Sequence, residues 1–317
     1  MTRLSRKVGI VKSCILGAAL AACLTLPAHA GEKKLVLGGT AALTTDYVFR
    51  GISQTGDNPA VQASVDATYG MFYLGAWGSN VDFGNVVPNA DIEIDYYGGI
   101  RPMWKGITFD IGGIYYTYPG ACEGACGLGD PDYFELKTGA AYTFGQKLTL
   151  AVTNYWSPDF GAEFGDGDAV EGTAAYVFSG KIFNFFSPSI SGLFGYQTVD
   201  LLGDYTYWNA GLTLGFMEKW SADIRYWDTD ASDVTCVSYV GFTTNCEPRV
   251  VGTLKAVSRF HNFPKSTSHL KGAPSRRPFF RPPPVAYRRP WPRRSREGPR
   301  LRRTRPRSQE RTRSTRR

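Results

Sequence analysis

The chain has 317 residues and a formal net charge of +8, from 36 Lys and Arg residues against 28 Asp and Glu residues. That average hides three unlike parts. Residues 1–30 carry four basic residues and no acid, residues 31–260 carry 13 basic and 26 acidic residues, and residues 261–317 carry 19 basic and two acidic residues. The overall charge therefore gives no argument for binding nucleic acid, which is not expected as a partner.

All three histidines lie outside residues 31–260, the part that is expected to fold. This excludes histidine-dependent catalysis and histidine metal sites from that part. The sequence also has no phosphate-binding loop, dinucleotide fingerprint or nucleophile elbow. We therefore expect no enzyme, no cofactor and no metal.

The first 30 residues have the pattern of a secretory signal peptide. Basic residues from Arg3 to Lys12 precede a mostly small or apolar stretch, and Ala28-His29-Ala30 forms a small-residue cleavage site. An alternative is a lipoprotein signal, because Leu20-Ala21-Ala22-Cys23 resembles a lipidation box. Both interpretations predict export through the Sec pathway. No later stretch reaches the length of about 18 apolar residues that a transmembrane helix needs.

From residue 35 to residue 260, apolar and polar residues alternate with the period of two that is typical of β-strands. The clearest runs are 60–69, 91–100, 133–144, 207–216 and 220–227. Less regular runs are 35–49, 71–81, 107–118, 147–156, 169–178, 188–197 and 249–260. These twelve candidate strands have the length of about ten residues that a tilted strand needs to cross a bilayer.

The connections between these runs alternate in length. The short ones are 70, 101–106, 145–146, 180–187 and 217–219, and the long ones are 51–58, 82–90, 119–132, 157–168, 198–204 and 228–248. This pattern predicts an all-β fold, a transmembrane antiparallel up-and-down β-barrel of about 12 strands at residues 31–260. An even number of strands places both termini on the short-turn side, toward the periplasm.

A soluble β-sandwich would show the same alternation, but two features favour the barrel. Strands that run toward the periplasm end in a mostly aromatic set typical of an interfacial girdle: Tyr69, Ile100, Phe144, Phe178, Phe216 and Phe260. The polar faces carry many charges, which would line a wet interior while the apolar faces meet lipid. These pore-lining candidates are Asp66, Asp91, Glu93, Asp95, Asp110, Glu135, Lys137, Glu171, Asp223 and Arg225.

Residues 45–54 form a specific string, Thr-Asp-Tyr-Val-Phe-Arg-Gly-Ile-Ser-Gln. Together with Tyr73-Leu74-Gly75-Ala76-Trp77 and Tyr115-Tyr116-Thr117-Tyr118-Pro119, it resembles the Gcw_chp family of conserved hypothetical bacterial outer-membrane proteins over about residues 35–254. The motif residues are Asp46, Tyr47, Phe49, Arg50, Gly51, Ser53 and Gln54. The resemblance implies an outer-membrane β-barrel in the Gram-negative envelope and no particular substrate.

Residues 261–317 repeat Arg and Pro and cannot build a core, so a disordered tail is expected. One interpretation is a polycationic arm that binds nucleic acid, lipid phosphates or an acidic partner. The other is a frameshift or read-through artefact. The second is favoured because the resembling family usually ends soon after the last strand.

Four cysteines fall in two long loops, and in an oxidising compartment they predict two local disulfides, Cys122–Cys126 and Cys236–Cys246. Cross-loop pairing and a zinc ion held by all four thiolates are alternatives, although their spacing is poor for zinc. Asp166 and Asp168 could hold Ca²⁺, but the loop lacks the complete calcium-binding pattern. Glu93 and Asp95 share a strand face, for which lumen-lining carboxylates are favoured over an acid–base pair.

Twelve strands fall between small filled barrels and open porins, so we expect a narrow channel or one partly plugged by side chains. The pore-lining candidates comprise eight acids and two basic residues, which favours a passive channel for small cationic or neutral solutes. The alternative is a non-conducting barrel whose disulfide-braced extracellular loops bind a ligand or partner. Expected partners are outer-membrane lipid and lipopolysaccharide, the barrel assembly machinery and an unidentified small solute.

Overall fold

The structure is a computed structural model that describes residues 34–84, 86–122 and 129–260. The expected signal peptide, with its cleavage and lipidation sites, lies outside the described residues, as do Cys126 and the Arg/Pro-rich tail.

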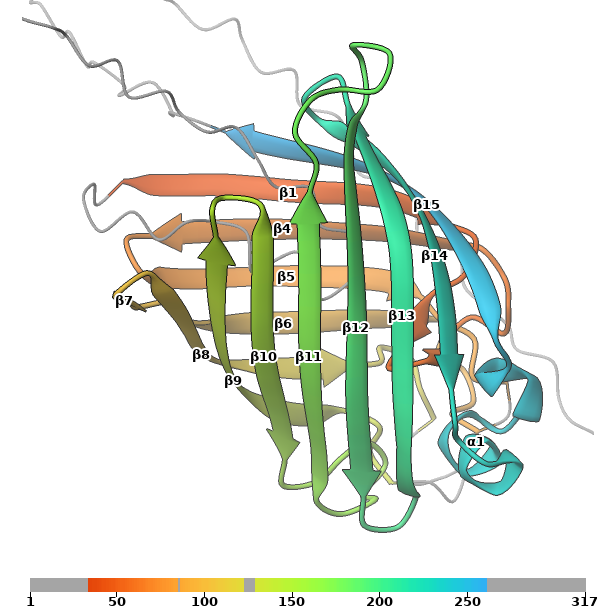
Figure 1. The fold of residues 1–317 in the computed structure, drawn as a ribbon. Helices are drawn as coiled ribbons and strands as arrows, with labels where there is room; N and C mark the ends of the chain where they lie inside the picture. The colour runs from red at the N-terminus through yellow and green to blue at the C-terminus, as the bar shows by residue number, and fades with distance from the viewer. Residues whose placement is uncertain (1–33, 85, 123–128, 261–317) are drawn as a thin grey trace, which may run out of the picture. The chain divides into compact units, whose positions relative to one another are not determined.

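Twelve antiparallel strands form a closed barrel, which confirms the predicted fold (Figure 1). They are β1 (Leu35–Thr44), β4 (Ala60–Tyr69), β5 (Phe72–Asn80), β6 (Ile92–Ile100), β8 (Ile107–Thr117), β9 (Tyr133–Phe144), β10 (Leu148–Ser157), β11 (Gly167–Val177), β12 (Ser187–Val199), β13 (Gly203–Phe216), β14 (Trp220–Thr229) and β15 (Arg249–Phe260). Each pairs with its neighbour along the barrel, and β1 pairs with β15 to close it. This closure excludes the β-sandwich alternative.

Two expected boundaries are wrong. The first strand ends at Thr44, not at residue 49, because the following residues leave the barrel wall and form the small hairpin of β2 (Val48–Phe49) and β3 (Ile52–Ser53). The expected long connection 198–204 shrinks to three residues, since β12 and β13 continue their pairing as far as Val199 and Gly203. Both ends of the barrel sequence lie at the short-turn end, where Leu37 pairs with Phe260.

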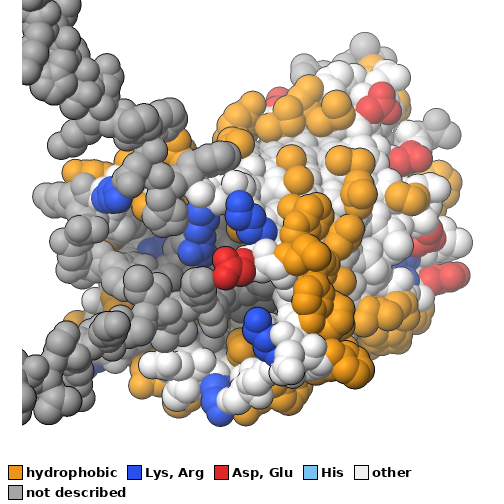
Figure 2. All heavy atoms as spheres, turned by 90° about the horizontal axis from the view of Figure 1, so that it is seen from above, with side chains coloured by type: hydrophobic (Ala, Val, Ile, Leu, Met, Phe, Trp, Pro, Cys, Tyr) orange, Lys and Arg blue, Asp and Glu red, His pale blue; other side chains and the backbone are white. Residues whose placement is uncertain are grey.

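The outward face of the strands is apolar. Val65, Leu74 and Val250 are 62–66% exposed although they lie within regular strands, and Figure 2 shows hydrophobic side chains over much of the outer wall. A wall of exposed aliphatic side chains this large is stable in lipid and not in water. In the expected girdle, Tyr69, Phe144 and Phe178 are exposed at the short-turn end.

The remaining elements lie at the ends of the barrel. The short β7 (Met103–Trp104) pairs with β8 at the short-turn end. At the other end, the last long connection contains α1 (Asp233–Val240) and the 3-10 helix η2 (Thr243–Cys246). Ser232 caps α1 by accepting a hydrogen bond from the backbone N–H of Thr235. None of the helices in the described ranges has the length and apolar character needed to cross a membrane.

A disulfide joins Cys236 in α1 to Cys246 in η2, which is one of the two local pairings expected from the sequence. It closes a loop of about ten residues and so restricts the unfolded chain. Because Cys126 lies outside the described residues, the Cys122–Cys126 pair stays a prediction.

We predict that Val65→Arg destabilises the barrel by about 2–4 kcal/mol, because Val65 lies mid-strand on the lipid face, whereas Val61→Arg near the strand end costs only about 0–1 kcal/mol. Both residues belong to β4 and are exposed to nearly the same degree, 66% and 64%. Urea unfolding of the protein refolded into lipid vesicles measures the difference. Equal costs for the two variants would contradict the lipid-facing placement of β4.

Candidate functional site: a chain segment folded into the barrel

Residues 45–59, called here the inserted segment, connect β1 to β4 but turn inward from the barrel wall. Tyr47, Ile52 and Ser53 are 0–2% exposed, whereas an ordinary extracellular loop of this length would be solvated. The hairpin of β2 and β3 turns at Arg50 and Gly51, both with positive φ, 48° and 84°. Positive φ at both central residues defines the tight hairpin turn that favours glycine at its second position.

Gly51 is required by packing as well as by conformation. A Cβ atom at this position would lie 2.7 Å from Cβ of Tyr207 on β13. Arg50 lacks the conformational freedom of glycine. A non-glycine residue in the left-handed region of φ and ψ carries backbone strain. Such strain persists only where the surroundings hold the residue in place, which directs attention to the contacts of Arg50.

Arg50 forms a two-pronged ion pair with Glu135 of β9. Its Nη1 lies 2.8 Å from Oε1 of Glu135, and its Nη2 donates to Oε2 at 2.8 Å. Nη1 also donates to Oε1 of Gln197 on β12 at 3.2 Å. Tyr116 of β8 donates to the same carboxylate at 3.0 Å. The inserted segment is therefore fixed to two separate parts of the barrel wall by one guanidinium.

The ion pair is buried, with side chains only 2–3% exposed. The guanidinium lies over the rings of Phe49 and Tyr155, at 4.6 and 5.0 Å from their centroids. Burial by itself would lower the pKa of Arg50, but the Glu135 carboxylate overrides it and holds that pKa well above its ordinary value. Arg50 therefore remains charged and needs a counter-ion.

A second contact fixes the start of the hairpin. The hydroxyl of Tyr47 donates to Oε1 of Glu93 on β6 at 2.9 Å, and its ring packs edge-on against Trp77 of β5 at 5.2 Å. Glu93 and its neighbour Asp95 are both 2% exposed. Protein atoms rather than water thus surround these two carboxylates.

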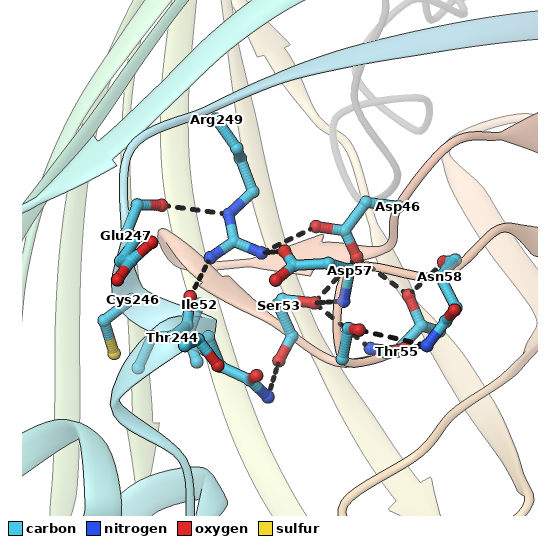
Figure 3. Close-up of polar contacts among 12 residues, drawn as sticks. Asp46, Ile52, Ser53, Thr55, Asp57, Asn58, Thr244, Cys246, Glu247 and Arg249 are labelled. Atoms are coloured by element: carbon cyan, nitrogen blue, oxygen red, sulfur yellow. Dashed lines mark hydrogen bonds and ion pairs between the residues drawn. The ribbon is translucent and has the colours of Figure 1, made fainter.

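A third set of contacts joins the inserted segment to the last long connection (Figure 3). Arg249, at the start of β15, pairs with Asp46 at 2.9 Å and also with Asp57. It donates in addition to the backbone oxygens of Thr244 and Glu247. Asp46 in turn accepts from Ser53 and Thr55 within the inserted segment, at 2.7 and 2.8 Å.

The motif residues of the sequence therefore converge on one structural task, which is to hold a hairpin inside the barrel. Phe49 packs edge-on against Tyr116 at 6.0 Å. The backbone N–H of Gln54 donates to the oxygen of Tyr47, and its own oxygen accepts from Asp82 of the next connection. Each motif residue contacts either the wall or another part of the segment.

Nine of the ten pore-lining candidates lie on barrel strands and are buried or half-buried. Four of them form ion pairs in the half of the barrel that carries the short turns. Asp110 pairs with Lys137 and also with Arg101, and Asp223 pairs with Arg225, at nitrogen–oxygen distances of 3.0–3.2 Å. Asp66 accepts from Tyr97 at 2.6 Å, and Glu171 accepts from Tyr207 at 2.9 Å. Asp91 differs, since it precedes β6 and its side chain is exposed.

The expectation that all the inner acids face open water needs correction at the level of Glu93 and Glu135. Both are 1–2% exposed because the inserted segment covers them. The sequence pattern predicts a strand at residues 45–49 and a polar loop at 51–58, and it does not predict that Arg50 pairs with Glu135. The available signal was a single arginine among aromatic residues, beside a barrel interior with more acids than bases.

A closed antiparallel barrel with a lipid-facing apolar wall and a polar, charged interior defines an outer-membrane β-barrel protein. The family model described as a bacterial protein of unknown function, Gcw_chp, matches residues 29–257. The chain belongs to this family. No significant match is found among curated protein sequences.

Solved structures with a similar course of the chain include outer-membrane channels. The KdgM porin is 8% identical, with 71% of this chain and 99% of that chain covered and a TM-score of 0.44. The NanC porin is 8% identical, with 71% and 98% covered and a TM-score of 0.40. The COG4313 outer membrane channel from Pseudomonas putida F1 is 10% identical, with 71% and 94% covered and a TM-score of 0.37. Such low identities say nothing about a shared solute.

We predict that Arg50→Met destabilises the protein by about 3–5 kcal/mol, because it leaves Glu135 buried without its counter-ion. The double variant Arg50→Met with Glu135→Met should recover much of this loss, since neither charge then remains. Urea unfolding followed by tryptophan fluorescence measures both variants and the single variant Glu135→Met, with exposed Lys181→Met as the control. If the double variant loses the sum of the two single losses, the ion pair does not hold the segment.

Proposed function

We propose that the protein is a narrow passive channel of the outer membrane for small cationic or neutral solutes, with the inserted segment as its constriction. One observation carries the proposal: a polar interior is closed at the level of Glu93 and Glu135 by a hairpin from a connecting loop. A barrel that served only as a scaffold could fill its interior with side chains of the wall. A hairpin that is held by a few polar contacts can instead narrow the passage, or it can move out of the passage and open it.

The charge of the interior supports the preference for cations and neutral solutes. Asp66, Glu93 and Glu171 accept hydrogen bonds from tyrosine hydroxyls, and they form no ion pair within the described part of the chain. Two basic side chains of the inner wall, Lys137 and Arg225, each form an ion pair with an aspartate. An interior with spare carboxylates attracts cations and repels anions.

We predict that replacing residues 46–57 with a five-residue Gly/Ser connection raises the single-channel conductance several-fold, because the hairpin is removed and Thr44 still pairs with Ala60 across a short loop. Planar-bilayer recording of the refolded full chain measures it. Arg50→Ser, which removes the guanidinium but keeps the rest of the hairpin, should give frequent openings to the same larger conductance. An unchanged conductance in both folded variants would contradict the constriction.

We also predict that the unaltered protein prefers K⁺ to Cl⁻ and that Glu171→Gln combined with Asp66→Asn weakens this preference. Reversal potentials in a KCl gradient measure the ratio of the two permeabilities. Asp91→Asn is the matched control, because this exposed carboxylate lies outside β6. A preference for anions in the unaltered protein would refute the proposal.

The route to the membrane follows from the same proposal. We infer export through the Sec pathway, insertion by the barrel assembly machinery, and contact with outer-membrane lipid and lipopolysaccharide on the apolar wall. The exposed aliphatic residues of that wall support the lipid contact.

A second candidate function is a non-conducting barrel whose extracellular connections bind a ligand. The observation that favours it is the buried Arg50–Glu135 ion pair, which closes the interior beneath these connections. The two candidates differ in one measurement, since only the channel conducts while the inserted segment is intact.

A further inference from the structure

We propose that the outer end of the barrel holds a binding site for one small, uncharged aromatic compound that carries a hydrogen-bond acceptor. The site is a cavity of about 80 Å³ between the inserted segment and the neighbouring long connections. This inference does not depend on conduction, because the cavity lies outside the set of carboxylates on which the proposed channel rests.

Aromatic rings from separate parts of the chain form the cavity. Phe49 comes from the inserted segment, Phe83 from the connection before β6 and Tyr118 from the segment after β8. Phe160 comes from the connection before β11, Tyr205 from β13 and Tyr239 from α1. Several contact one another edge-on: Tyr239 lies 5.3 Å from Tyr205 and 6.2 Å from Phe160, and Phe83 lies 5.6 Å from Tyr118. A planar ring can add to such an arrangement by stacking or by edge-to-face contact.

The chemistry of the lining excludes a charged ligand. No Asp, Glu, Lys or Arg side chain is among the described residues that line the cavity. Burial raises the pKa of Tyr239, so its hydroxyl stays protonated at neutral pH. Arg50, which donates to the lining residue Gln197, already has Glu135 as its counter-ion. An ion placed here would lose its hydration without gaining a partner.

One polar group of the lining is available to a ligand. Gln197 is 1% exposed, and its Oε1 accepts from Arg50. This contact fixes the amide so that Nε2 is the remaining donor. The amide lies beside the Tyr239 hydroxyl, but among the described residues Nε2 of Gln197 has no hydrogen-bond acceptor of normal geometry. Because a buried donor without an acceptor costs free energy, a ligand that brings an acceptor is favoured.

The volume limits the ligand to about one ring. An apolar cavity of about 150 Å³ binds benzene, so a cavity of about 80 Å³ takes no ligand larger than one ring, and the surrounding side chains must move slightly to admit that ring. A fused ring system or an oligosaccharide would not fit without moving the surrounding connections.

Benzamide is a suitable probe, since it is neutral, planar and carries a carbonyl acceptor. A ligand of about nine heavy atoms should bind with a dissociation constant of about millimolar or somewhat below. Ligand-observed NMR titration of the refolded full chain in detergent micelles measures binding. Benzoate and benzylamine, which have the same ring with a charge, should bind at least about tenfold more weakly because the cavity offers no counter-ion.

Ala162→Trp tests the position of the site, because Ala162 lines the cavity and the added indole fills it. Binding should be abolished. Glu163→Trp is the matched control: residue 163 is exposed and absent from the lining, so binding should be retained. Partition of benzamide into micelles is the same for both variants and cancels in the comparison.

Equal binding to the two variants would overturn the proposal, as would tighter binding of benzoate or benzylamine than of benzamide. Binding of a neutral monosaccharide such as methyl glucoside without binding of benzamide would also overturn it. Failure here leaves the conductance predictions intact, since none of them uses this cavity.

Discussion

The architecture depends on one electrostatic interaction: the buried ion pair between Glu135 of the barrel wall and Arg50 of the inserted segment. Glu135 is 1% exposed on the inner face of β9, and the wall supplies it with a tyrosine hydroxyl but no cation in the described chain. Arg50 provides the cation from the inserted segment, at 2.8 Å on both oxygens. The attraction between the two charges keeps the inserted segment inside the barrel. It also offsets the conformational strain of the Arg50 backbone.

The remaining features are consistent with that arrangement. The wall is apolar outside and charged inside, so lipid and polar groups are separated by the alternation of each strand. Gly51 permits the close approach of the hairpin to Tyr207, and Arg249 ties the same hairpin to the disulfide-containing connection beside it. The aromatic cavity forms where these connections meet above the hairpin. One inserted segment thus determines both the closure of the interior and the surface presented at the outer end.

The sequence predicts the barrel well because strand alternation is a local pattern. The expected run 133–144 coincides with β9, and 60–69 coincides with β4. Local alternation does not predict where long-range contacts take over. Residues 45–49 continue the pattern of β1, yet the chain leaves the wall there because Tyr47 binds Glu93, 46 residues away, and Arg50 binds Glu135, 85 residues away. The inner wall's acids are visible in sequence, but their pairing is not, since Asp110 meets Lys137 only after the barrel closes.

Limited proteolysis with trypsin tests most directly whether the inserted segment lies inside the barrel. The full chain, refolded in detergent, is digested briefly and the cleaved bonds are identified by mass spectrometry. The account predicts cleavage after exposed Lys181 in the nine-residue connection before β12, and no cleavage after Arg50, which is 5% exposed. Rapid cleavage after Arg50 in the folded barrel would contradict the account, because it would place the segment in solvent as an ordinary extracellular loop.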